Sequence, residues 1–203
     1  MFYRAEEDHG LSHNPLKAIV APRPIGWIST LSAGGVANLA PYSFFNAVSD
    51  TPPMLMFASG GEKDSLTNAR ATGEFTFNYA SSRMTDAMNL SSGGYEPDKD
   101  EFEIAGLEKV KGETVACPRV AGVPAALECK VLDIIQPIDL SGEKTIYQIV
   151  LGQVTGVHID DAMITDGRFD VKKADPLMRA GYRDYALVSD MFELARPPGA
   201  GGM

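Results

Sequence analysis

The sequence contains little cysteine. Only Cys117 and Cys129 occur among its 203 residues, and they form neither a CxxC motif nor a metal-ligand pattern. Free cysteine is among the most buried residue types, so we expect two buried, unreactive thiols. His9 and His13 have a spacing that can chelate a metal on a helix. Because no third ligand in a matching motif accompanies them, we predict no metal site.

Positive charge is also scarce, with 18 Lys and Arg against 27 Asp and Glu and a formal net charge of −9. A nucleic-acid-binding protein would show a basic face, and an anionic membrane would repel an acidic protein. We therefore expect no nucleic acid and no membrane as partners. An anionic cofactor would have to be held locally, by a cluster of positive charge and backbone N–H groups.

No apolar run approaches the roughly 18 residues of a membrane span. The N-terminal segment is charged and lacks the apolar region of a signal peptide, so we expect a cytoplasmic protein. The GxGxxG fingerprint of a dinucleotide-binding fold and internal repeats are missing as well. We predict a polar lead-in over residues 1–17, one domain over 18–190 and a disordered tail over 191–203.

Short strand patterns fill most of the chain. The predicted strands cover residues 19–31, 36–40, 54–58, 74–80, 125–135 and 145–159, and the predicted helices cover 11–16, 65–72, 83–90 and 102–106. Glycines after residue 32 supply the turn of a hairpin between the first two strands. Many short strands with few long helices indicate an antiparallel barrel with peripheral helices.

Residues 41–46, with the sequence PYSFFN, place aromatic rings beside small polar side chains directly after the hairpin. This mixture is unusual in a surface loop and typical of a pocket wall, where flat apolar faces lie beside hydrogen-bonding groups. We expect an irregular elbow here. A hairpin with a proline-kinked edge explains the same residues, so composition alone leaves both interpretations open.

A second polar loop, residues 59–65, precedes a predicted helix. Asp64 or Ser65 can cap this helix, and the free N–H groups at its start suit a phosphate, beside which Lys63 adds a full charge. A capped surface helix with a solvated lysine is the alternative. The Gly- and Ser-rich run over residues 91–100 also has two interpretations, a mobile lid and an ordinary surface loop.

Several segments, taken in order, resemble the flavin reductase-like family, whose members are FMN-binding split β-barrels. They are residues 23–30 (RPIGWIST), 38–46 (NLAPYSFFN), 50–53 (DTPP), 62–65 (EKDS), 73–75 (GEF), 100–102 (DEF), 127–129 (LEC) and 175–177 (DPL). The family includes flavoredoxins and the reductase components of two-component monooxygenases. The resemblance implies a mainly β, antiparallel, Greek-key-like split barrel with a few peripheral helices.

The resemblance also implies an FMN site at a homodimer interface. The residues expected along the ribityl chain and phosphate are Arg23, Pro24, Trp27, Ser29 and Thr30. Those expected at the isoalloxazine edge are Asn38, Ala40, Pro41, Tyr42, Ser43 and Asn46. Lys63, Asp64 and Ser65 would complete the phosphate site.

The activity that the resemblance implies is NAD(P)H-dependent reduction of FMN, with the reduced flavin serving a partner such as a monooxygenase. NADH or NADPH would bind transiently over the flavin, and the candidates for the nicotinamide side are His158, Arg179 and Tyr182. A solvated or locally hydrogen-bonded His158 is the other interpretation. No catalytic acid or base is assigned, because cofactor and cosubstrate carry this chemistry. An FMN electron carrier without efficient turnover and a non-enzymatic flavin-binding protein remain alternatives.

Overall fold

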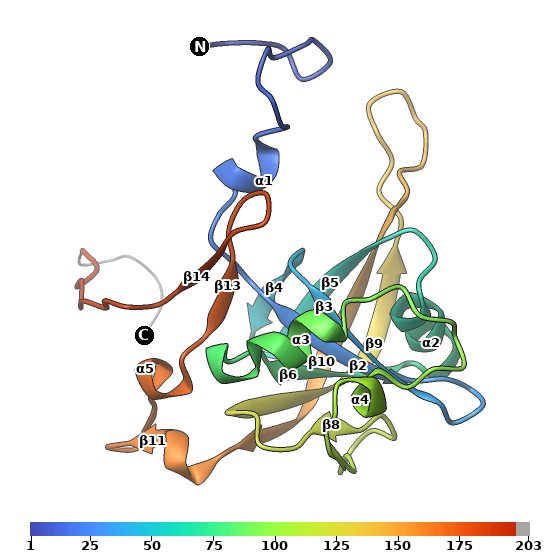
Figure 1. The fold of residues 1–203 in the computed structure, drawn as a ribbon, viewed down its shortest axis with the longest axis vertical. Helices are drawn as coiled ribbons and strands as arrows, with labels where there is room; N and C mark the ends of the chain where they lie inside the picture. The colour runs from blue at the N-terminus through green and yellow to red at the C-terminus, as the bar shows by residue number, and fades with distance from the viewer. Residues whose placement is uncertain (198–203) are drawn as a thin grey trace.

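A curled antiparallel sheet is the centre of the computed structural model, which describes residues 1–197 (Figure 1). Its seven strands follow the order β3-β2-β6-β9-β10-β5-β4. They are β2 (Gly26–Leu31), β3 (Ala37–Tyr42), β4 (Phe45–Asp50), β5 (Pro53–Gly60), β6 (Glu74–Tyr79), β9 (Ala125–Ile135) and β10 (Tyr147–Ile159). The mainly β split barrel expected from the sequence is confirmed.

The sheet curls because its two edge strands follow one another in the chain. Only Ser43 and Phe44 separate β3 from β4, so the two edges must lie close together. The Ala58 amide donates to the Phe44 carbonyl at 2.8 Å, and the rings of Tyr42 and Phe57 lie 4.8 Å apart between centroids. The barrel is therefore closed at this two-residue connection.

Strand β2 is buried on both faces, because successive side chains of a strand point to opposite sides. Ile28 belongs to the core inside the barrel with Phe57 and Phe75, whereas Trp27 belongs to a second core with Phe102. Both cysteines are buried free thiols, as predicted. Burial raises the pKa of Cys117 to about 12 and raises that of Cys129 as well.

Helices and small sheets surround the barrel. The helices are α1 (Leu16–Ile19), α2 (Asp64–Thr72), α3 (Thr85–Leu90), α4 (Glu101–Ile104) and α5 (Val171–Ala174). Three small sheets pair β1 (Arg23–Pro24) with β13 (Leu177–Arg179) and β14 (Tyr185–Leu187), β7 (Lys109–Val110) with β8 (Arg119–Val120), and β11 (Ile164–Thr165) with β12 (Arg168–Phe169). Short 3₁₀ turns cover Ser82–Met84 and Asp161–Met163. Helix α2 ends at Gly73, whose positive φ of 71° suits a residue without a side chain.

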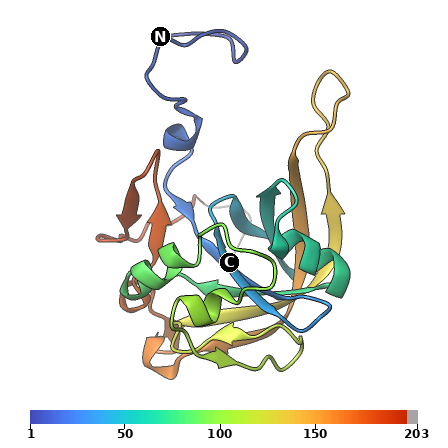
Figure 2. The same ribbon diagram turned by 45° about the vertical axis from the view of Figure 1, so that its right-hand side comes forward.

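Two segments project from the barrel in both views, the N-terminal segment and the connection between β9 and β10 (Figures 1 and 2). The connection carries the exposed apolar side chains of Ile138, Leu140 and Ile146. No helix within residues 1–197 is long and apolar enough to cross a membrane.

The strand predicted over 125–135 is confirmed as β9 with the same bounds, and β10 begins two residues later than predicted, at Tyr147. The strand predicted over 19–31 is wrong in its first half, because Pro24 pairs with β13 instead and lacks the N–H that a continuous ladder needs. The irregular elbow is wrong as well, since β3 continues to Tyr42 and β4 begins at Phe45.

The helix predicted over residues 11–16 is also misplaced, because α1 follows Pro15 and covers Leu16–Ile19. Proline is tolerated at a helix start but not inside a helix. Of the predicted tail, residues 191–197 contain no helix or strand, and residues 198–203 lie outside the described residues.

Candidate functional site

A cavity of about 630 Å³ opens where the edges of the barrel meet. Its walls come from β3 and the connection to β4, the start of α2, the loop over residues 91–97 and the beginning of β10. Eight residues predicted from the sequence line it: Asn38, Ala40, Pro41, Tyr42, Ser43, Lys63, Asp64 and Ser65. The structure brings these together from β3 with its connection to β4 and from the start of α2, while what they bind stays a prediction.

One wall of this cavity is aromatic. The rings of Phe44 and Tyr147 lie 5.6 Å apart between centroids and are tilted by 38°. Strand β5 comes close to Tyr147 at Gly60, where a Cβ atom would lie only 3.1 Å from the Tyr147 ring. Lys17 places its ammonium 5.9 Å from the centroid of Phe44. Such a wall suits a flat, electron-poor ring system.

The N-terminus of α2 forms the opposite, polar part of the cavity. Lys63 is the N-cap residue and makes no side-chain capping bond. Thr67 is the first residue of the helix whose amide bonds back, to the Lys63 carbonyl at 2.9 Å, so the amides before it are free of intrahelical partners. The predicted cap at Asp64 or Ser65 is therefore wrong, by one or two residues, but amides without intrahelical partners suit an anion.

A polar network behind the cavity holds this region in place. Asn38 donates through Nδ2 to Ser65 Oγ at 2.8 Å and to Thr30 Oγ1 at 3.3 Å. Asn68 of α2 donates to the same Thr30 oxygen at 3.1 Å. Thr30 thus lies behind the wall rather than in it. Its hydroxyl ties β2, β3 and α2 together, which fixes the helix start against the strand.

Carboxylates lie in the cavity beside its two lysines. Glu62 is bound by Arg70, at 2.9 Å to Nη1, and this contact lowers the pKa of Glu62. Glu101 is 5% exposed and accepts from the Leu39 amide at 2.9 Å. Burial raises the pKa of Glu101, and the nearby charge of Asp64 raises it further. The charge of Glu62 is therefore paired with an arginine, whereas Glu101 is buried and holds the Leu39 amide.

The Tyr42 hydroxyl is buried in the cavity wall and has no hydrogen bond of acceptable geometry, although Ser59 and Ser65 lie near it. Burial raises the pKa of Tyr42, and the charges of Asp64 and Glu101 add to this effect. Buried polar atoms in proteins almost always have partners, so an orphan hydroxyl here needs an explanation. A ligand with hydroxyl or carbonyl groups would supply the missing partner.

Three residues that we expected to contact FMN do not line the cavity. Arg23 donates to the carbonyls of Lys17 and Val20 and to that of Ala180, the last at 3.0 Å, and so fastens the N-terminal segment to the barrel. Pro24 pairs with Met178 of β13. Neither residue lines the cavity, because β1 is turned toward the small sheet. Asn46 is exposed on β4, where its side chain accepts from the Ala47 amide.

Two further predicted contacts, Trp27 and Ser29, are fully buried behind the site. Trp27 donates through Nε1 to Ser91 Oγ at 2.9 Å, which anchors the start of the loop over residues 91–97. Ser29 donates to the Pro118 carbonyl at 2.5 Å. Trp27 therefore acts on the cavity through that loop and through its strand partner Pro41, which lines the cavity.

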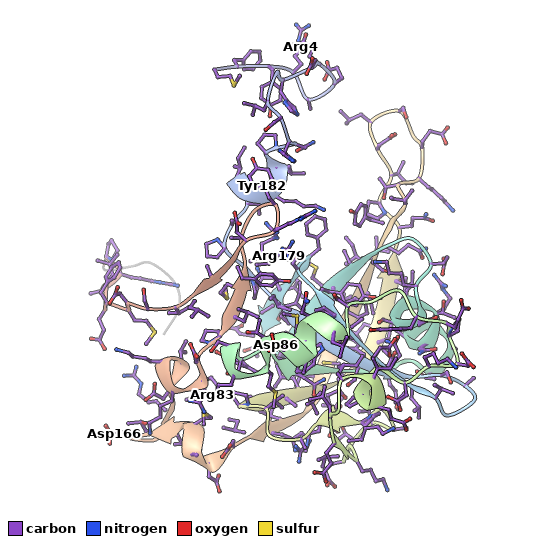
Figure 3. The ribbon with its side chains drawn as sticks, viewed as in Figure 1. Arg4, Arg83, Asp86, Asp166, Arg179 and Tyr182 are labelled. Atoms are coloured by element: carbon purple, nitrogen blue, oxygen red, sulfur yellow. The ribbon has the colours of Figure 1, made fainter. Side chains whose placement is uncertain are left out.

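The three nicotinamide candidates are not brought together. Arg179 and Tyr182 lie beside α1, outside the barrel (Figure 3), where Arg179 donates to the Tyr182 carbonyl at 2.5 Å and the Tyr182 ring contacts His13. His158 lies at the end of β10 and lines a different cavity. His158 is hydrogen-bonded to Glu128, which agrees with the alternative interpretation of a locally hydrogen-bonded histidine.

Sequence reasoning missed Lys17, Phe44, Glu101 and Tyr147, which also line the cavity. Phe44 was within the segment recognised as a pocket wall. The other three residues, Lys17, Glu101 and Tyr147, are far in sequence from the segments that predicted the cavity. Tyr147 reaches the cavity because the register of β10 on β5 pairs it with Gly60. The run over residues 91–97 was recognisable by composition, and it contributes a wall.

Comparisons with known proteins place this chain in a family. Residues 20–178 match the Flavin reductase like domain, so the chain belongs to the flavin reductase-like family, as its motifs indicated. It is 33% identical over 183 residues to the uncharacterized protein BH2278 of Halalkalibacterium halodurans, covering 88% of this chain and 87% of that one.

Two solved structures are similar over most of their length. Nitrilotriacetate monooxygenase component B from Bacillus cereus superimposes with a TM-score of 0.82 at 26% identity, covering 93% of this chain and 100% of that chain. The 2-nitrobenzoate 2-nitroreductase NbaA of Pseudomonas fluorescens gives a TM-score of 0.79 at 28% identity, covering 92% and 91%.

Proposed function

We propose that the cavity binds FMN and that the protein is an NAD(P)H-dependent flavin oxidoreductase that delivers reduced flavin or electrons to a partner such as a monooxygenase. The observation that carries the proposal is the free N-terminus of α2, with Lys63 at its cap, in the same cavity as an aromatic wall. Its volume of about 630 Å³ falls in the usual range for cofactor sites. Membership of the flavin reductase-like family supports the same cofactor.

The residues present fit FMN in three places. The α2 amides and Lys63 would hold the phosphate, since backbone N–H groups and a cation both favour a dianion. The unpartnered Tyr42 hydroxyl would bond a polar group of the cofactor. Phe44 and Tyr147 would cover a face of the ring system. When bound, FMN would supply a ring that accepts a hydride and passes electrons on.

The chain itself would position the reactants and exclude water rather than transfer protons. Residues 91–95 close one side of the cavity, anchored at Ser91 by Trp27. The barrel wall closes the other side. The relative that is a monooxygenase component B supports a role in supplying an oxygenase, and the relative that is a nitroreductase supports direct use of the electrons as the competing outcome.

An absorbance spectrum of the purified protein, followed by anaerobic titration with NADH and with NADPH, tests the proposal. We expect FMN to bind and its 450 nm band to bleach with one of the two nucleotides. A yellow protein that neither nucleotide reduces would instead be an electron carrier. A protein that fails to bind FMN would overturn the proposal altogether.

A homodimer is part of the same proposal. Ile138, Leu140 and Ile146 are 63%, 109% and 71% exposed on the projecting connection, and clustered exposed apolar side chains are typical of interfaces. We expect light scattering at micromolar concentration to give twice the 21.8 kDa of one chain. Leu140→Glu should shift the protein toward the monomer. A monomeric parent protein that still holds FMN would remove the dimer from the proposal.

A further inference from the structure

A second cavity, of about 410 Å³, lies between β8, the loop that follows it and the ends of β9 and β10. It shares no lining residue with the first cavity, which we proposed to bind FMN and call the flavin cavity. Two nitrogen-bearing side chains, Arg119 and His158, line it together with Asp160 and the apolar side chains of Val123, Ala126 and Val157. Nothing in the proposed flavin chemistry uses this arrangement.

Arg119 has an unusual environment. Its side chain makes no hydrogen bond and no ion pair with any of residues 1–197, and its Nε atom is buried without a partner. Arg70, by contrast, is bound to Glu62 at 2.9 Å. A buried guanidinium nitrogen without an acceptor is costly, and such groups in native structures usually mark a function or a missing partner. The natural partner of a guanidinium is a carboxylate or phosphate, which it can bind through two parallel bonds.

His158 is held rigidly beside it. Its Nε2 lies 2.6 Å from Oε1 of Glu128, which is fully buried. Glu128 also accepts from the amides of Glu113 and Thr114, at 2.8 and 2.5 Å, and from the Thr114 hydroxyl at 2.6 Å. Burial alone would raise the pKa of Glu128, but these hydrogen bonds hold it at about 2. The carboxylate therefore stays ionised, Nε2 donates to it, and Nδ1 is left without a partner within the described part of the chain.

The charges and walls of the cavity narrow the class of ligand. The guanidinium of Arg119 attracts an anion, which it can bind through two parallel hydrogen bonds. Asp160 lines the same cavity, and its negative charge opposes a second charge on the ligand. The side chains of Val123, Ala126 and Val157 suit an apolar body.

We propose that this second cavity binds a small organic monocarboxylate, with its carboxylate on Arg119 and its apolar body against the valine and alanine side chains. Glu128 is the positioning residue, since it fixes the His158 ring in the cavity wall. The site is separate from the flavin cavity, so the proposal does not depend on the protein being a flavin reductase.

The test is a two-dimensional ¹H–¹⁵N NMR titration of the full chain with benzoate, with and without added FMN. We expect saturable shifts of the amides in residues 119–126 and 157–160 in both cases. Benzamide has the same shape without the charge and should bind at least about tenfold more weakly, the scale of one charge-assisted contact. No saturable binding, or shifts confined to the flavin cavity, would overturn the assignment. Equal binding of benzamide would do the same.

Variants locate the contact. Arg119→Gln should weaken benzoate binding by about tenfold or more. Arg183→Gln removes the same charge from an exposed residue and should change nothing. Unchanged binding by Arg119→Gln would refute the site.

If that variant does not fold, Asp160→Asn replaces it, because asparagine can keep the capping bond to the Ala162 amide. The Asp160→Asn variant should bind benzoate more tightly and should let inorganic phosphate compete with it. If either effect is absent, the ligand is not a monocarboxylate. The same conclusion follows if phosphate binds the parent protein more tightly than benzoate does.

Discussion

The two cavities differ in which groups are left without partners. In the flavin cavity the free groups are the backbone amides of α2 and one neutral hydroxyl, and the nearby charge of Glu62 is matched by Arg70. In the second cavity the free groups belong to two side chains, Arg119 and His158. Backbone donors survive substitution, whereas side-chain donors do not. A single substitution in the first cavity should therefore leave the backbone donors in place, whereas one in the second cavity removes a donor altogether.

The largest expected effect is at the carboxylate behind the second cavity. Glu128→Gln should lower the free energy of unfolding at pH 7 by about 3 kcal/mol, the value of a pKa shift of this size. The pKa of Glu128 is about 2 in the folded state against an ordinary 4.5. Its stabilising contribution is therefore complete above pH 4.5 and is lost as the pH falls toward 2.

Urea unfolding of both proteins at pH 7 and pH 3 checks this, and the difference between them should shrink at pH 3. Glu103→Gln is the matched control, because this glutamate is 76% exposed and its contact with Lys109 is loose, at 3.4 Å. The control should lose well under 1 kcal/mol. A difference between parent and Glu128→Gln that does not depend on pH would contradict the ionised, hydrogen-bonded carboxylate.

A smaller effect is expected for the charged part of the flavin cavity. Lys63→Ala should weaken FMN binding by about 10- to 150-fold, since a charge-assisted contact contributes roughly 1.5 to 3 kcal/mol. Riboflavin lacks the phosphate, so its affinity should be nearly unchanged. Fluorescence titration measures both ligands, and Lys111→Ala, at an exposed lysine outside the cavity, is the control. A parallel loss of riboflavin affinity would mean that Lys63 does not contact the phosphate.

Next comes the orphan hydroxyl. Tyr42→Phe should weaken FMN binding by roughly two- to twelvefold, the scale of one neutral hydrogen bond of about 0.5 to 1.5 kcal/mol. Tyr79→Phe removes a hydroxyl from a tyrosine that does not line the cavity and should leave the affinity unchanged. If Tyr42→Phe instead stabilises the protein and leaves FMN affinity intact, the hydroxyl has no partner in the complex either.

The smallest effect concerns the charge balance of the flavin cavity. Arg70→Gln removes the charged partner of the exposed Glu62 carboxylate, which keeps its hydrogen bond from Gln148, so the added repulsion should weaken FMN binding by less than about threefold. The effect should disappear in 0.5 M salt, because exposed charges are screened. The double variant Arg70→Gln with Glu62→Gln should restore the parent affinity. A loss that persists at high salt would point to a distorted loop rather than to charge.

The sequence predicted much of the flavin cavity because its polar residues stand in two short segments with distinctive composition. Lys63 could be found in this way, whereas Asn38 was implied by the resemblance of residues 38–46 to the family. Glu101 and Tyr147 could not, since their places depend on which strands become neighbours. The sequence also did not predict the two-residue connection after Tyr42. Proline and aromatic residues extend a strand only where a partner strand pairs with them, and here that partner is β2.

Strand β6 shows a different kind of failure. Its alternation correctly separates Phe75 from the polar positions Thr76 and Asn78, yet both polar side chains are fully buried. The segment ahead of and within β8 lies across them: Thr76 donates to the Cys117 carbonyl, and the Val120 amide donates to Asn78. Alternation identifies the two faces of a strand, but it does not reveal that a distant loop supplies the partners of the polar face.

The connection of only Ser43 and Phe44 between the two edge strands has a consequence for folding. The cavity at this seam exists only after all seven strands have paired in order, including the distant pairing of β5 with β10. A ligand bound there would stabilise the closed barrel as a whole, by a free energy that grows with the logarithm of its concentration relative to its dissociation constant. The flavin content of a preparation would then report the fraction of chains whose sheet has closed correctly.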